Sequence, residues 1–192
     1  MVVADRRDTA VSERAARLIA VDGANGAAVA EAARSALSTS GRRRGGISWW
    51  DASGLFEQLT VAGDEAGLPS ARTLLLLYAA DLAFRLRWEI EPTLADGNTV
   101  VAAPYVDTAV AFGRAAGLPG GWLTNLFRFT LTPGDRRYVD AAAAHAAVKP
   151  HGFVEFACAQ LSGRVLGLTR QQLAGRTRAR LKARAARTQR PR

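Results

Sequence analysis

LIAVDGANGAAVA at residues 18–30 begins with a short apolar run that ends at Asp22-Gly23. An apolar run of this length that leads into a glycine turn is typical of a buried strand. The alanine-rich stretch from Ala27 to Leu37 that follows has the composition of a helix. The stretch therefore predicts the opening strand, turn and helix of an alternating α/β fold.

Two further short apolar runs, Ile47 to Trp50 and Thr99 to Ala103, predict strands. The second is almost wholly apolar, as the central strands of a parallel sheet tend to be. The longest helix candidate lies between them, from Ala71 to about Leu94, after a helix start at Pro69-Ser70. This order of elements predicts a three-layer α/β/α sandwich with a mainly parallel sheet and right-handed crossovers.

Shorter patterns predict the remaining elements. Residues 41–46 read GRRRGG, which predicts an exposed loop. Thr169 is followed three residues later by Gln172, a spacing that resembles a capping box and predicts a last helix. Between these two segments we expect, in chain order, a helix at Thr108 to Ala116, a helix at Trp122 to Phe127, a strand at Arg136 to Val139 and an amphipathic helix at Phe153 to Leu166.

The positive charge is concentrated at one end of the chain. The formal net charge is +9, but ten of the 26 basic residues and none of the 17 acidic residues follow Glu155. The 16 bases and 17 acids of residues 1–163 therefore give a net charge of −1. We expect an N-terminal arm at residues 1–16, one domain at 17–168 and a basic helix and tail at 169–192, with weak, nonspecific nucleic-acid contact as a possible role of the tail.

Several classes of protein are excluded by the composition. No apolar run reaches the length of about 18 residues that a membrane-spanning helix needs, so we expect a cytoplasmic protein without a membrane partner. Cys158 is the single cysteine, and His145 and His151 are the only histidines, so we expect neither an internal disulfide nor a metal site. Cys158 lies in an apolar stretch, which favours a packed thiol over a nucleophile.

The segment from Leu74 to Pro119 resembles the thymidylate kinase family, and the strand and glycine turn at residues 18–30 resemble its phosphate loop. In that family an apolar helix with an Ala-Asp-Arg turn leads to Pro-x-Leu, a glycine, an apolar strand, Asp-Arg-Tyr and Ser-Ser-x-Ala-Tyr-Gln. The corresponding segments here are Ala80-Asp81-Leu82, Pro92-Thr93-Leu94, Gly97, Val100-Val101, Ala103-Pro104-Tyr105 and Thr108 to Gly113. The resemblance implies the fold of a P-loop nucleotide kinase.

The same resemblance implies that the groups that handle phosphate are missing. Val29 stands in the place of the loop lysine that reaches the phosphates, and Ala30 in the place of the hydroxyl that binds magnesium. On the substrate side, the family's arginines and polar groups correspond to Leu82, Ala103, Pro104 and Gly113. We therefore expect a degenerate member with no catalytic residue and no cofactor. Cations that could compensate are Arg34, Arg42, Arg43, Arg44, Arg72 and Arg85.

Some residues of the family pattern persist. They are Gly23, Asn25 and Gly26 as a vestigial phosphate loop, and Tyr105, Asp107, Thr108 and Phe112 as a vestigial substrate segment. One interpretation is a residual nucleoside pocket. The other, which we favour, is that the glycines form a tight turn and the aromatic residues pack in the core, because the anion-binding partners have gone.

Three functions follow from these patterns. The first is a catalytically inactive protein that acts by association, as a homodimer or with a protein partner, through the apolar helix from Leu74 to Ile90. The second is an active or weak dTMP kinase that uses ATP and magnesium with replacement residues. The third is nonspecific nucleic-acid binding through the basic tail, which contains no interleaved aromatic residues.

Overall fold

A computed structural model describes residues 16–40, 45–59, 69–139 and 152–161. The predicted N-terminal arm up to residue 15, the arginines at 42–44, both histidines, the capping box at Thr169 and the basic tail lie outside the described residues.

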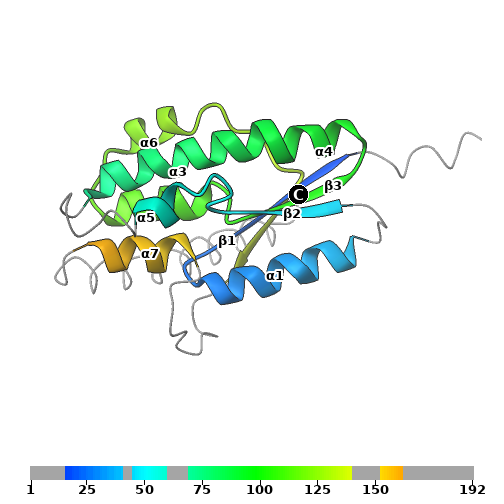
Figure 1. The fold of residues 1–192 in the computed structure, drawn as a ribbon, viewed down its shortest axis with the longest axis horizontal. Coiled ribbons are helices and arrows are strands. Elements are labelled where there is room, and N and C mark those ends of the chain that lie inside the picture. The colour runs from blue at the N-terminus through cyan, green and yellow to red at the C-terminus, as the bar shows by residue number, and fades with distance from the viewer. Residues whose placement is uncertain (1–15, 41–44, 60–68, 140–151, 162–192) are drawn as a thin grey trace, which may run out of the picture.

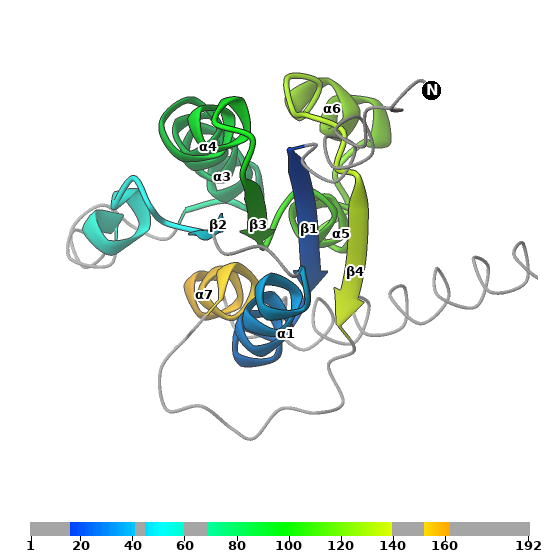
Figure 2. The ribbon, with the colours of Figure 1, turned by 90° about the vertical axis from the view of Figure 1, so that its right-hand side faces the viewer.

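The centre of the molecule is a four-stranded parallel sheet in the order β2-β3-β1-β4 (Figure 2). Its strands are β1 at Arg17–Gly23, β2 at Gly45–Trp49, β3 at Thr99–Ala103 and β4 at Asp135–Val139. The register pairs Leu18 with Val100 and Ala20 with Ala102 between the two central strands. Both central strands are buried, which is why their sequences are almost wholly apolar. The predicted fold class and parallel sheet are confirmed.

Helices cover both faces of the sheet, and residues 55–59 are also helical (Figures 1 and 2). They are α1 at Gly26–Thr39, α3 at Ala71–Arg85, the π-helical segment η1 at Leu86–Ile90, α4 at Glu91–Ala95, α5 at Asp107–Ala115, α6 at Gly120–Leu126 and α7 at Phe153–Gln160. Alternate strand residues divide the core between the two faces. Ile19 and Val101 pack with Val29 of α1, whereas Leu18 and Val100 belong to the larger cluster that includes α3 and α5.

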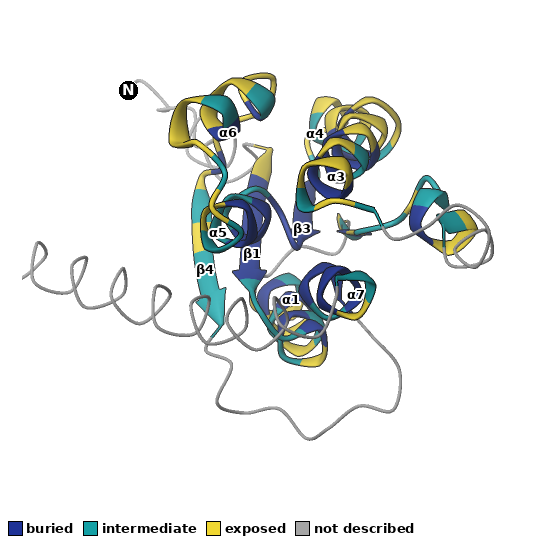
Figure 3. Cartoon of the chain, turned by 90° about the vertical axis from the view of Figure 1, so that its left-hand side faces the viewer, coloured by how far each residue is buried: buried dark blue, intermediate teal, exposed yellow. Residues whose placement is uncertain are grey.

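The predicted long helix is present as one continuous helical stretch from α3 through η1 to α4 (Figure 1). It begins at Ser70, whose side chain accepts a hydrogen bond from the Thr73 amide, and it ends before Gly97, which has a φ of 75°. Its sheet-facing residues are buried, and its outward surface is exposed (Figure 3). No described helix is long and apolar enough to cross a membrane.

Two predicted boundaries are wrong. Gly45 and Gly46, predicted to lie in a loop, form the start of β2. A Cβ atom at Gly45 would lie 2.6 Å from the Thr99 carbonyl oxygen, so the glycine permits close strand pairing there. Helix α7, predicted to continue to Leu166, ends at Gln160 because Leu161 has extended backbone angles. Residues 162–166 lie outside the described residues.

Candidate functional site

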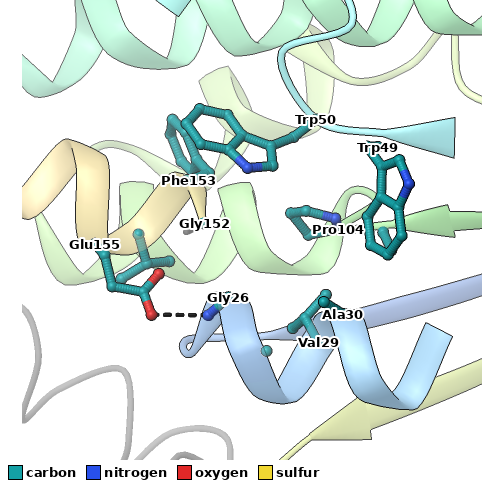
Figure 4. A pocket seen from close by; sticks show the side chains of 12 residues that line it. Gly26, Val29, Ala30, Trp49, Trp50, Pro104, Gly152, Phe153 and Glu155 are labelled. Carbon is teal, nitrogen blue, oxygen red and sulfur yellow. Dashed lines mark hydrogen bonds between the residues drawn. The ribbon is translucent and has the colours of Figure 1, made fainter. Parts of the chain in front are cut away.

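A cavity of about 180 Å³ lies at the carboxyl ends of the strands, where ligands bind in open α/β sheets (Figure 4). The glycine turn after β1, the start of α1, the end of β2 and the start of α7 form its walls. Its described lining residues are Gly23, Gly26, Val29, Ala30, Trp49, Trp50, Ala103, Pro104, Gly152, Phe153, Val154 and Glu155. The lining is therefore mainly apolar and carries a single charged side chain.

Two amide groups at the start of α1, those of Gly26 and Ala28, have side-chain partners within the protein. The Asn25 side chain caps the helix by accepting a hydrogen bond of 2.8 Å from the Ala28 amide. Glu155 of α7 accepts a hydrogen bond of 2.7 Å through Oε1 from the Gly26 amide (Figure 4). The partly positive N-terminus of α1 therefore faces a carboxylate supplied by the chain itself.

Helix α7 approaches the start of α1 at backbone distance. A Cβ atom placed on Gly152 would lie 2.7 Å from the Gly26 Cα atom and 2.7 Å from Glu155 Oε2. No side chain larger than glycine fits there without a shift of one helix. The other carboxylate oxygen, Glu155 Oε2, is buried and has no hydrogen-bond partner among the described residues. The space in front of α1 is thus occupied by α7.

No lysine, arginine or histidine is among the described residues that line the cavity. The described arginines that could have replaced a lost cation are engaged elsewhere. Arg34 pairs with Glu31 on the exposed side of α1, and the Arg72 guanidinium carbon lies 5.1 Å from the centre of the Trp122 ring. Arg85 is fully buried and donates to the Ser48 side chain, the Ser48 carbonyl and the Pro104 carbonyl.

Arg85 also lies 3.8 Å from the Asp81 carboxylate, and both side chains are fully buried. Asp81 in turn accepts hydrogen bonds from the amides of Asp51 and Ser53, which follow β2. Buried charges need partners of this kind, and these partners fix α3 to the ends of β2 and β3. The arginine therefore positions the backbone behind the cavity wall.

The predicted substrate segment is hydrogen-bonded to the end of β1. One oxygen of the buried Asp22 carboxylate accepts hydrogen bonds from the Tyr105 amide, the Thr108 amide and the Thr108 hydroxyl. The Thr108 hydroxyl oxygen also accepts a hydrogen bond from the Gly23 amide. Burial, followed by the nearby Asp107 carboxylate, raises the pKa of Asp22 to about 6.

The other predicted substrate residues are also engaged within the protein. Phe112 is fully buried, with its ring centre 5.4 Å from that of Phe153. The Tyr105 hydroxyl donates to the Leu131 carbonyl, and Asp107 accepts hydrogen bonds from Arg136 and Tyr138. None of these predicted substrate residues is among the described residues that line the cavity. Gly23 and Gly26 of the predicted loop do line it, and Asn25 caps the helix beside it.

Sequence reasoning missed the residues that give the cavity its character. Glu155 lies 129 residues from Gly26, and no local pattern connects the two. Trp49 and Trp50 are the last two residues of the strand predicted at Ile47 to Trp50, a position at the ligand edge of a parallel sheet. That position was the one available signal for the two tryptophans.

Comparison with known proteins gives a fold relationship. No protein-family model matches the chain. Among solved structures, the chain is similar to the crystal structure of thymidylate kinase from Ehrlichia chaffeensis, with 16% sequence identity and a TM-score of 0.53. The match covers 65% of this chain and 75% of that chain. The chain therefore has a thymidylate-kinase-like P-loop fold.

Proposed function

We propose that this chain is a catalytically inactive protein with a thymidylate-kinase-like fold and that it acts by association with protein. The observation that carries the first part is the hydrogen bond between Glu155 and the Gly26 amide. In P-loop kinases the corresponding amides face the phosphates of the nucleotide. Here a carboxylate lies in that place, and it would repel a phosphate group.

The surrounding side chains support the same conclusion. Phosphoryl transfer depends on cations that stabilise the charge of the transferred group. The family resemblance places Val29 at the position of the lysine. Its side chain is 3% exposed and packs in the core between α1 and the sheet. With no base among the described lining residues, ATP and its magnesium ion do not fit this site.

The substrate side supports the proposal as well. Leu82, at the position of a family arginine, is fully buried in the core. Pro104 is at the position of a second family arginine, and its carbonyl accepts hydrogen bonds from Arg85 and Tyr78. A nucleoside monophosphate would find no described cation at either position. The expected cytoplasmic location remains part of this proposal and rests on the sequence alone.

The association part rests on the outward face of the long helix. Leu76, Phe84 and Trp88 are 50%, 39% and 66% exposed, and Phe84 and Trp88 are neighbours on the helix surface because they are four residues apart. Large apolar side chains grouped in this way are typical of a contact surface. We propose that a second copy of the chain or another protein covers this face.

An assay for turnover tests the inactive assignment against the active alternative. Purified protein is incubated with ATP, magnesium and dTMP, and then with the other nucleoside monophosphates, and ADP is measured. We expect no ADP above the level of a sample without protein. Formation of dTDP that disappears when Gly26 is replaced by Val would contradict the proposal, because that loss would locate turnover at this loop.

A further inference from the structure

The walls of the cavity combine aromatic rings with small apolar side chains. Trp49 and Trp50 form one side, Phe153 lies beside Trp50, and Val29 and Ala30 of α1 lie opposite (Figure 4). The ring centres of Trp50 and Phe153 are 6.3 Å apart. Trp49 is 38% exposed, so this wall reaches the surface. Such a lining suits an apolar body and can also attract a cation through the ring faces.

The volume sets the size of the ligand. An apolar protein cavity of ~150 Å³ is large enough to bind benzene. The cavity here measures about 180 Å³, so it can hold one six-membered ring with a short substituent. A nucleotide is much larger than this space.

The charge of the lining residues indicates the sign of the charge that a ligand should carry. Glu155 is the single charged residue among the described residues that line the cavity, and none of them is basic. The Glu155 Oε1 atom accepts a hydrogen bond from the Gly26 amide, and the Oε2 atom has no hydrogen-bond partner among the described residues. A carboxylate in this setting is complementary to a cation that can donate hydrogen bonds.

We propose that the cavity binds a small organic monocation, an ammonium or guanidinium group attached to an apolar body of about one ring. The cationic group pairs with the Glu155 carboxylate, and the apolar body lies among Trp49, Trp50 and Val29. This inference rests on the proposed function, because a site that held nucleotide phosphates would not accept a cation of this kind. It extends that proposal by naming the ligand class of the altered site.

Three probes of similar size and different charge test the inference by isothermal titration calorimetry at neutral pH. They are benzylammonium, benzyl alcohol and benzoate. We expect benzylammonium to bind at least about tenfold more tightly than benzyl alcohol, and benzoate to bind most weakly. Equal affinity for the three probes, preference for benzoate or no binding of benzylammonium would overturn the inference.

Glu155→Gln removes the charge and keeps an oxygen that can accept the Gly26 hydrogen bond. We expect it to lower the affinity for benzylammonium to that for benzyl alcohol, with the alcohol unchanged. Glu31→Gln is the matched control, because Glu31 lies on the exposed side of α1. Loss of benzylammonium binding in both variants, or of both ligands in Glu155→Gln, would contradict a role for the Glu155 charge.

A second variant keeps the test decisive if Glu155→Gln does not fold. Ala30→Leu adds volume at the cavity wall without a change of charge, and we expect it to weaken benzylammonium and benzyl alcohol alike. Unchanged binding in a folded Ala30→Leu protein would place the probe elsewhere and overturn the inference. Nucleotide turnover by the unaltered chain would contradict the proposed function, whereas these titrations report on the ligand class alone.

Discussion

At the residue scale, we expect the buried carboxyl group of Asp22 to make the stability of the fold depend on pH. Its folded-state pKa is raised to about 6 from the ordinary value of 3.8, mainly by burial. The contribution of the protonated Asp22 carboxyl group to stability is therefore fully present below pH 3.8. It is lost as the pH rises through about 6. The expected loss is at most about 3 kcal/mol for a group with this pKa.

Asp22→Asn removes this titration while keeping an oxygen that can accept the hydrogen bonds from Tyr105 and Thr108. We expect the free energy of unfolding of the variant, measured with urea, to fall less between pH 4 and pH 7 than that of the unaltered chain. Asp96→Asn is the control, because Asp96 is exposed in the turn before β3. Parallel pH profiles for Asp22→Asn and the unaltered chain would show that Asp22 is not the source of the pH dependence of stability.

The candidate site could be predicted from the sequence only in its backbone. The spacing of Gly23, Asn25 and Gly26 predicted a turn and a helix start, and the structure has both. The occupant of that turn, Glu155, could not be predicted because its position depends on how α7 docks after the whole sheet has formed. A side chain at such a sequence distance leaves no local periodicity to detect.

At the scale of the element, the surroundings of Gly113 show how tightly α5 packs against its neighbours. A Cβ atom at this position would lie 2.5 Å from Leu123 Cδ2 and 2.7 Å from Leu75 Cδ1, both of which belong to buried side chains. Gly113→Ala therefore forces a repacking between α5, α6 and α3. We expect the free energy of unfolding to fall by about 1 kcal/mol, since the overpacking cost exceeds the gain in helix propensity.

Gly121→Ala is the matched control for this change. Gly121 lies in α6, and a Cβ atom there would meet no atom within 4 Å. This substitution gains helix propensity without a clash, so we expect stability to rise by up to about 1 kcal/mol. Urea unfolding of the two variants separates the packing cost from the propensity. A similar rise in both would show that the contact at Gly113 is loose.

At this same scale, the sequence predicted the elements better than their ends. The runs at Leu18 to Val21 and Thr99 to Ala103 are almost wholly apolar because both faces of these strands are covered, so composition alone identified them as strands. The start of β2 was missed because glycine patterns indicate loops, whereas Gly45 here permits close strand pairing. The π-helical segment η1 was also missed, since a single wide turn within a helix barely changes the apolar pattern.

Association, at the scale of the whole molecule, can be measured directly. We expect sedimentation of the full chain to give the mass of a dimer or, in native extract, of a complex. Phe84→Glu combined with Trp88→Glu places two charges on the exposed face of the long helix, so the complex is expected to dissociate at least about tenfold more readily. A strictly monomeric chain without a co-purifying partner would contradict the proposal.

A chain ending at Leu168 is the control for the basic tail. We expect it to associate like the full chain at low and at high salt, because apolar contacts are little affected by ionic screening. Association that is lost with the tail, or only at high salt, would instead locate the contact among the basic residues.

The docking of α7 has a consequence for the order of events during protein synthesis. Phe153 contacts the rings of Tyr78 and Phe112, with ring centres 4.4 Å and 5.4 Å away, and Glu155 satisfies the Gly26 amide. The ribosome produces these two residues long after it has produced their partners. We therefore expect the core to close only after α7 has emerged from the ribosome, because these long-range contacts cannot form earlier.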